Sequence, residues 1–182
     1  MFQAAVRPGL AIALVEERHA APLFALVDAE REQLRRWMPW VDATNAEDDI
    51  LAFIRASLQQ FANNQGFAAA IWAEGRLAGV IGTQPVNRLN RKAEVGYWLA
   101  SEFQGRGIMT DCCRAVVRHL LIEMELNRIE ILCATQKAKS RAIPQRLKFQ
   151  HEGTLREGQL LNGEFVDLEL YSMLRRDVPS LG

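Results

Sequence analysis

Residues 93–135 constrain the fold of this 182-residue chain more than any other stretch. The segment 93–99 alternates like a strand buried on one face, because Val95, Tyr97 and Leu99 fall at every second position. An amphipathic helix follows from Thr110 to about Glu125, and residues 128–135 form a second apolar strand. A connection of this length suits a right-handed crossover, so the pattern predicts two parallel strands in one sheet.

The other predicted elements surround this unit. We expect helices over 19–38, 47–63 and 140–147, and strands over 10–14, 67–72, 77–83, 151–155 and 165–173. Asn162-Gly163 marks a turn between the last two strands. Early helices followed by an antiparallel meander and a crossover unit are typical of an α+β fold with a mixed sheet. The length suits one domain, residues 1–182.

The balance of charge argues against a general nucleic-acid binder. The chain has 22 Lys and Arg against 22 Asp and Glu, whereas such a binder needs a surplus of cations. We expect no membrane span, which takes roughly 20 apolar residues, and no secretory signal at the start. The three cysteines, Cys112, Cys113 and Cys133, make a poor disulfide framework, and the histidines are too scattered for a metal site. We therefore expect a cytoplasmic protein without a metal.

The loop from Gln104 to Thr110 is the best candidate for a ligand site. Gly105 and Gly107 let the backbone approach a ligand closely, and free N–H groups at the start of the next helix attract anions. The expected ligand is a phosphate or pyrophosphate. The stretch matches neither a Walker loop nor a dinucleotide fingerprint. On spacing alone, a tight connection that needs glycine only for its geometry explains it equally well.

Four stretches, taken together and in order, carry a family resemblance. They are Glu94-Val95-Gly96-Tyr97-Trp98-Leu99, Phe103-Gln104-Gly105-Arg106-Gly107-Ile108-Met109-Thr110, Leu126-Asn127-Arg128-Ile129-Glu130 and Ser140-Arg141-Ala142-Ile143-Pro144. The chain resembles the GNAT acetyltransferases, most closely the branch that acetylates α-amino groups of ribosomal proteins. This resemblance implies a mixed, mostly antiparallel central sheet that splays between two parallel strands and is flanked by helices. It also implies acetyl-CoA as cosubstrate, no metal, an amine acceptor and a homodimer.

The resemblance further implies where acetyl-CoA binds. Backbone N–H groups of the glycine loop would hold the pyrophosphate, with binding residues Gln104, Gly105, Arg106, Gly107, Ile108, Met109 and Thr110. The pantetheine arm would lie where strand 93–99 splays from strand 128–135, against backbone groups of Tyr97, Trp98 and Leu99 that also polarise the thioester carbonyl. Lys137 and Ser140 would border the arm, and the cations around the coenzyme would be Arg106, Lys137, Lys139 and Arg141.

The family mechanism is direct attack of a neutral amine on the thioester through a tetrahedral intermediate. Ser140 matches the position near the departing sulfur and would act as the acid, although a serine there also suits the N-cap of the 140–147 helix. Glu94 is the candidate base, and a structural ion pair with a nearby arginine (Arg88, Arg91 or Arg128) is the alternative. Glu169 and Tyr171 are weaker candidates for the base.

Three positions depart from the family pattern. Lys137 stands where relatives carry an asparagine whose amide binds the coenzyme arm, and lysine offers no acceptor. Lys148 replaces a glycine past the 140–147 helix, so either a left-handed lysine costs about 1 kcal/mol or the helix ends differently. Gln159 replaces an acidic residue, for which Glu157 and Glu164 are nearby substitutes.

The acceptor side is the least defined by the sequence. The segment 35–40 would wall the acceptor cleft, with Arg36, Trp37 and Trp40 as substrate-binding residues, whereas simple core packing explains Trp37 as well. We expect acetylation of a protein N-terminal amine. The alternatives are acetylation of a small amine such as a polyamine or an antibiotic, and coenzyme A binding with weakened catalysis.

Overall fold

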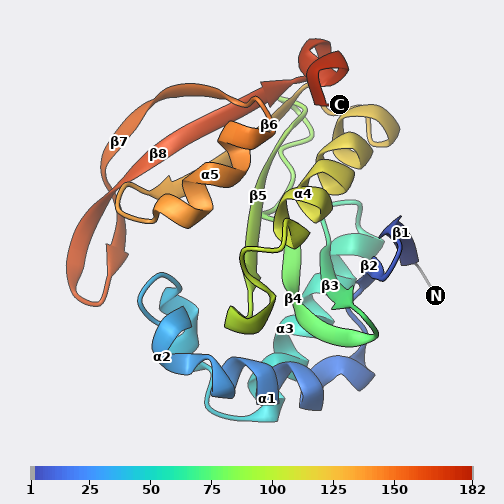
Figure 1. Cartoon of the computed structure of the whole chain (residues 1–182), viewed down its shortest axis with the longest axis vertical. Coiled ribbons are helices and arrows are strands. Elements are labelled where there is room, and N and C mark those ends of the chain that lie inside the picture. Colours follow the sequence, from blue (N-terminus) through green and yellow to red (C-terminus); the bar gives the residue numbers. More distant parts are fainter. Residues whose placement is uncertain (1–2, 182) are drawn as a thin grey trace.

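The computed structural model describes residues 3–181 and is built on one eight-stranded sheet. The strands are β1 (Gln3–Arg7), β2 (Leu10–Leu14), β3 (Ala68–Ala73), β4 (Arg76–Thr83), β5 (Lys92–Leu99), β6 (Arg128–Ala134), β7 (Gln150–Leu161) and β8 (Glu164–Leu174). Their order is β1-β2-β3-β4-β5-β6-β8-β7 (Figure 1), in which β5 and β6 are parallel and every other neighbouring pair is antiparallel. This confirms the predicted α+β fold with a mixed, mostly antiparallel sheet.

The parallel pair holds together at one end only. Residues 92–94 of β5 pair with residues 128–130 of β6, and beyond this point the strands have no paired residues. The sheet therefore opens between β5 and β6, as the resemblance implies (Figure 1).

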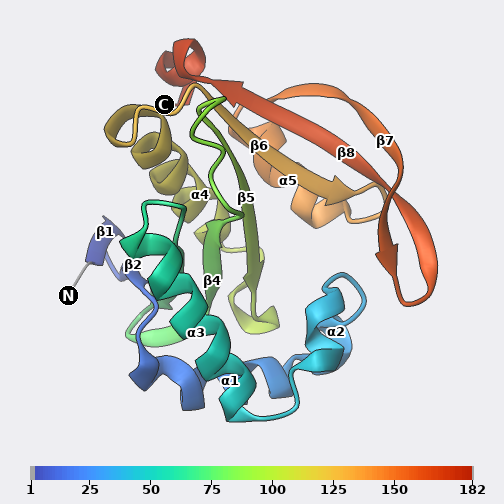
Figure 2. The same cartoon turned by 180° about the vertical axis from the view of Figure 1, so that it is seen from behind.

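Helices cover both faces of the sheet. They are α1 (Ala20–Ala29), α2 (Arg31–Leu34), α3 (Glu47–Ala62), α4 (Ile108–Arg118) and α5 (Ala138–Arg146). Figure 1 shows α4 and α5 on one face, and Figure 2 shows α1 and α3 on the other. Neighbouring residues of β4 serve the two layers, since Ile81 packs with the α4 core and Val80 with the α1–α3 core.

The prediction of one continuous helix over 19–38 is wrong. The α1 helix ends at Ala29, Glu30 leaves the helical region, and α2 is a single turn. Arg31 explains the change of direction, because its guanidinium donates to the backbone carbonyls of Val41 at 2.9 Å and Thr44 at 2.7 Å. These bonds hold the turn Pro39–Ala43 across the sheet instead of letting the helix run on.

Two further boundaries differ from the prediction. The α5 helix begins at Ala138 with Lys137 as its N-cap, so Ser140 lies inside the first turn and the predicted N-cap role of Ser140 is wrong. The α4 helix begins at Ile108, two residues before the predicted start, and a π-helical turn follows it at His119–Glu123. The strand β1 was not predicted, because its mostly exposed residues leave no apolar alternation to detect.

Of the two alternatives that the sequence leaves open, Lys148 takes the left-handed conformation, with φ at 64°. Lys148→Gly is expected to raise the free energy of unfolding by about 0.5–1 kcal/mol, since the strain removed exceeds the freedom that glycine adds to the unfolded chain. Urea unfolding measures this change. Lys148→Ala keeps the strain and serves as the matched control, and an equal gain in both variants would show that the left-handed backbone is not the cause.

Candidate active site

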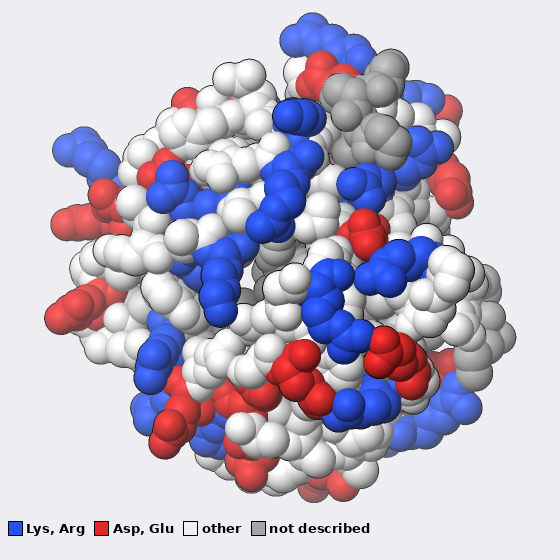
Figure 3. Space-filling view, in the orientation of Figure 1, with Lys and Arg blue, Asp and Glu red and all other residues white. Residues whose placement is uncertain are grey.

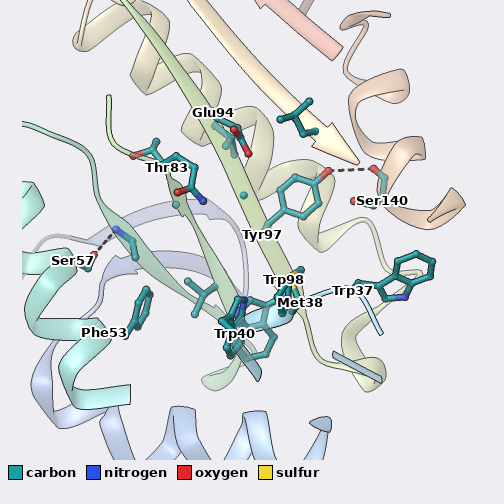
Figure 4. Close-up of a pocket in the computed structure, with 18 of the residues that line it drawn as sticks. Trp37, Met38, Trp40, Phe53, Ser57, Thr83, Glu94, Tyr97, Trp98 and Ser140 are labelled. Atoms are coloured by element: carbon teal, nitrogen blue, oxygen red, sulfur yellow. Dashed lines mark hydrogen bonds between the residues drawn. The ribbon is translucent and has the colours of Figure 1, made fainter. Parts of the chain in front are cut away.

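A cavity of about 700 Å³ lies where β5 and β6 part. Its walls come from α1, the segment 37–44, α3, strands β3 to β6, the first turn of α5 and β7. Among the described residues that line it, only Asp49, Glu94 and Lys137 are charged, and the rest are mostly apolar or aromatic. The mouth of the splayed strands therefore opens into a largely apolar chamber, part of which Figure 4 shows.

The glycine loop has the geometry of an anion site. Gly105 and Gly107 have φ values of 74° and 75°, a region that favours glycine, and Gly107 is the N-cap of α4. Nothing lies within 4 Å of a Cβ built at Gly105, so the backbone there is open to a ligand. The first-turn N–H groups of α4 point out of the helix beside this loop.

Side chains brace the loop from both sides. Gln104 donates to the carbonyl of Leu99 at 3.1 Å and accepts from Lys139 Nζ at 3.2 Å. Arg106 forms an ion pair with Glu74 at 2.5 Å, on the β3–β4 turn. Thr110 Oγ1 accepts from Arg146 of α5 at 3.3 Å. The face that carries α4 and α5 shows Lys and Arg side chains around a hollow (Figure 3), although the whole chain has no net charge.

Ser140 lies between two other groups that carry protons. Its Oγ is 3.4 Å from Cys133 Sγ, and its backbone carbonyl accepts a hydrogen bond from Tyr97 Oη at 3.2 Å (Figure 4). Burial raises the pKa of Tyr97 and of Cys133 above their ordinary values, so both stay protonated at neutral pH. The three side chains meet at the mouth of the opening between β5 and β6.

Glu94 stands on β5 at the last residue that pairs with β6. Burial is the main reason that its pKa is raised, and the negative charge of Glu130 adds to the effect. Among the described residues Glu94 has no ion-pair partner, because Arg128 pairs with Glu130 at 2.7 Å and Glu152 at 2.5 Å, and Arg88 donates to a backbone carbonyl. The alternative of a structural ion pair at Glu94 is therefore wrong.

Glu169 and Tyr171, the weaker candidates for the base, do not line the cavity. Glu169 binds His151 at 2.5 Å and Thr154 at 3.1 Å, and the first of these bonds is the main reason that its pKa is lowered. Tyr171 Oη accepts from Arg141 at 3.4 Å and from a glutamine of α5 at 3.3 Å. Tyr171 thus ties α5 to the sheet.

The predicted acceptor residues separate in the structure. Trp37 and Trp40 line the cavity, whereas Arg36 is exposed and is absent from the lining. Lys137 Nζ lies 5.7 Å from the ring centre of Trp37, and burial lowers the pKa of Lys137. The ring of Trp40 lies 6.3 Å from that of Trp98.

Several lining residues were missed by the sequence reasoning. They are polar or aromatic side chains of α3 and of the end of β4 with the residue after it, chiefly Phe53, Ser57, Thr83 and Gln84. Their helical or strand periodicity matches ordinary packing, so no local signal marks them. Gln159 does line the cavity, while Glu157 and Glu164 do not. In the described part of the chain, no group of three His, Cys, Asp or Glu could hold a metal ion, and no helix is long and apolar enough to cross a membrane.

Comparison with known proteins agrees with this geometry. The sequence profile of the acetyltransferase (GNAT) domain matches residues 10–150. The chain is 36% identical to a putative ribosomal N-acetyltransferase of Bacillus subtilis, over 97% of each chain. It is 28% identical to the ribosomal-protein-serine acetyltransferase of Escherichia coli, over 93% of this chain and 94% of that one.

A solved structure adds the fold-level evidence. The ribosomal L7/L12 alpha-N-protein acetyltransferase RimL, in complex with coenzyme A, superposes with a TM-score of 0.92 at 24% identity, covering 94% of this chain and 97% of that one. The two chains therefore share one fold. The chain belongs to the GNAT acetyltransferase family and is an acetyl-CoA-dependent N-acetyltransferase.

Proposed function

We propose that this enzyme acetylates the α-amino group of a protein or peptide N-terminus. The observation that carries the proposal is the cavity at the opening of the sheet, where an unpaired carboxylate, Glu94, and a hydroxyl, Ser140, face one chamber from β5 and α5. The relatives named above as ribosomal acetyltransferases support a protein amine as the acceptor.

The arrangement of β5 gives acetyl-CoA a place to bind. From Val95 onward, β5 pairs with β4 on one side only, so the edge toward β6 has no strand partner among the described residues. Nothing lies within 4 Å of a Cβ built at Gly96, so one face of β5 is open at this position. We expect the pantetheine arm along residues 97–99 and the pyrophosphate on the N–H groups of residues 105–110.

Two residues on opposite walls of the chamber, Glu94 and Ser140, would carry out the proton transfers. The neutral amine nitrogen attacks the thioester carbon, and Glu94, whose raised pKa suits a base, takes the proton that the nitrogen loses as the tetrahedral intermediate forms. Collapse of the intermediate breaks the carbon–sulfur bond. Ser140 Oγ would give a proton to the departing thiolate and regain one from solvent.

The charges in the chamber argue against a polyamine as acceptor. Asp49 is already occupied, because one of its oxygens accepts from the N–H groups of Asn45 at 2.8 Å and Ala46 at 2.9 Å. Glu94 remains as the single unpaired carboxylate, and Lys137 adds a positive charge. A chamber with one unpaired carboxylate and one lysine suits an acceptor that has one amino group and few other charges.

The proposal includes a cytoplasmic location, where ribosomal proteins are made, and the homodimer expected from the resemblance. The three cysteines are free and buried, as suits a reducing compartment. In the β7–β8 hairpin, Leu160 pairs with Phe165, and both side chains are exposed. This apolar pair is available for a contact between two copies of the chain.

A thiol-release assay tests the proposed acceptor. With acetyl-CoA present, short peptides with a free N-terminal serine or alanine are expected to release coenzyme A at least tenfold faster than spermidine at equal concentration. The same peptides with a blocked N-terminus are the control and should give background rates. Tight coenzyme A binding without thiol release on any acceptor would instead support a binding protein with weakened catalysis.

A further inference from the structure

Two large aromatic side chains in the cavity are unusually open. Trp40 is 38% exposed and Phe53 is 45% exposed, although both line the chamber that holds Glu94. Exposed aromatic rings inside a concave site offer apolar surface that a ligand can cover. The proton transfers described above use neither ring.

The two rings come from different, well-anchored elements. Trp40 lies in the turn Pro39–Ala43, where its carbonyl accepts from Thr44 Oγ1 at 3.0 Å, and its ring rests against Trp98 of β5. Phe53 projects from the middle of α3, one helical turn from the buried Ile50. In Figure 4 the ring of Phe53 lies on the α3 side and the rings of Trp40 and Trp98 lie opposite it.

The position of charge gives the acceptor an orientation. Glu94 is the unpaired carboxylate of the chamber and suits an amine, whereas the Trp40–Phe53 end contains no free charged group among the described lining residues. Glu94 and Trp98, on which Trp40 packs, lie four residues apart on β5, roughly 13 Å along an extended strand. An acceptor with its amine on the Glu94 side therefore directs the side chain of its next residue toward the apolar end.

We propose that Trp40 and Phe53 form a specificity subsite that takes an aromatic side chain carried close to the reacting amine. The inference rests on the proposed function, since it assumes an amine acceptor in this chamber. For a peptide acceptor, the inference predicts an aromatic side chain at the second residue. Flat rings pack against tryptophan and phenylalanine more favourably than an alanine methyl or a hydrated carboxylate does.

Acetylation of three matched peptides tests the subsite: Ser-Phe-Gly-Gly, Ser-Ala-Gly-Gly and Ser-Asp-Gly-Gly. The wild-type kcat/KM is expected to be at least tenfold higher for the phenylalanine peptide than for either other peptide. Phe53→Ala should reduce this preference to less than threefold, with KM for acetyl-CoA unchanged. Trp40→Ala should reduce the preference to the same extent. Equal kcat/KM values for the three peptides in the wild type would overturn the subsite.

Control variants separate recognition from folding. Ile122→Ala removes an apolar side chain that is also 45% exposed but lies outside the cavity, and it should keep the full preference. Because Trp40 also packs on Trp98, its variant could lose stability, and Phe53→Leu offers a milder probe in which the preference falls while Tm is retained. A preference that survives in both Phe53 variants would contradict the proposal.

A second pair of acceptors separates this inference from the proposed function. Tryptamine and ethanolamine are both primary amines, and only tryptamine carries a ring. If no peptide reacts but tryptamine reacts at least tenfold faster than ethanolamine, the subsite stands and the N-terminal acceptor is wrong. If no acceptor reacts, calorimetry with coenzyme A present measures the affinity for the peptides. The subsite requires tighter binding of the phenylalanine peptide than of the alanine peptide. Equal affinities would refute it.

Discussion

Replacing Ser140 with alanine is expected to lower kcat by about 10²- to 10⁴-fold, while KM for acetyl-CoA changes less than threefold. The range is that of a positioned proton donor. The hydroxyl lies at the opening between β5 and β6, where the departing sulfur is expected, and without it the thiolate must leave unprotonated. Steady-state kinetics with a peptide acceptor measures both constants.

The structure makes alanine a well-defined probe at this position. Ser140 is not the N-cap of α5, so the substitution removes no capping bond. The bond from Tyr97 goes to the backbone carbonyl of residue 140, and alanine retains it. Ser101→Ala is the matched control, since Ser101 is exposed and bonds to Glu30 away from the cavity. An unchanged kcat in Ser140→Ala would remove the hydroxyl from the mechanism.

Local sequence patterns predicted most of the fold because the decisive interactions are local or periodic. The α4 stripe and the alternation of β5 both reflect burial on one face, and the structure contains both elements. The break after α1 escaped prediction because it depends on bonds from Arg31 to carbonyls ten and thirteen residues further along the chain. The edge strand β1 escaped because exposed residues carry no burial signal.

The candidate site was predictable only where a motif marks it. Glycines with positive φ at 105 and 107 leave a pattern that can be read from the sequence. The acceptor chamber leaves none, because it forms where the segment 37–44, α3 and β7 meet after folding. Phe53 looks like an ordinary apolar helix residue, and only the folded chain places its ring in the cavity.

The second large effect is expected at Glu94, where Glu94→Gln should lower kcat/KM by about 100-fold or more. Glutamine keeps the size of the side chain but cannot take the proton of the amine. In the wild type, kcat/KM should rise with pH through two ionisations. One belongs to the acceptor, roughly pH 7.7–8.0 for an α-amine, and the other belongs to Glu94, whose pKa is raised above the ordinary value for a glutamate. The variant should lose the Glu94 ionisation.

A neighbouring variant tests the assignment by shifting this ionisation without removing Glu94. Glu130 raises the pKa of Glu94 through its negative charge. In Glu130→Gln the ionisation assigned to Glu94 should therefore move to lower pH, and activity near neutral pH should persist. Arg128 keeps its other partner, Glu152, in this variant. A profile that stays in place would show that this ionisation does not belong to Glu94.

Stability should respond to Glu94→Gln in the opposite direction from activity. Because the pKa of Glu94 is higher in the folded than in the unfolded chain, the folded state binds the proton more tightly, and its stability falls as pH rises through that interval. Above this interval the wild type carries a half-buried charge that glutamine lacks, so Tm of the variant should be higher there. Below the interval both side chains are neutral, and the difference should vanish. A variant that is less active and more stable above the interval would identify Glu94 as a carboxylate whose charge serves catalysis, whereas a loss of both properties would identify it as a structural residue.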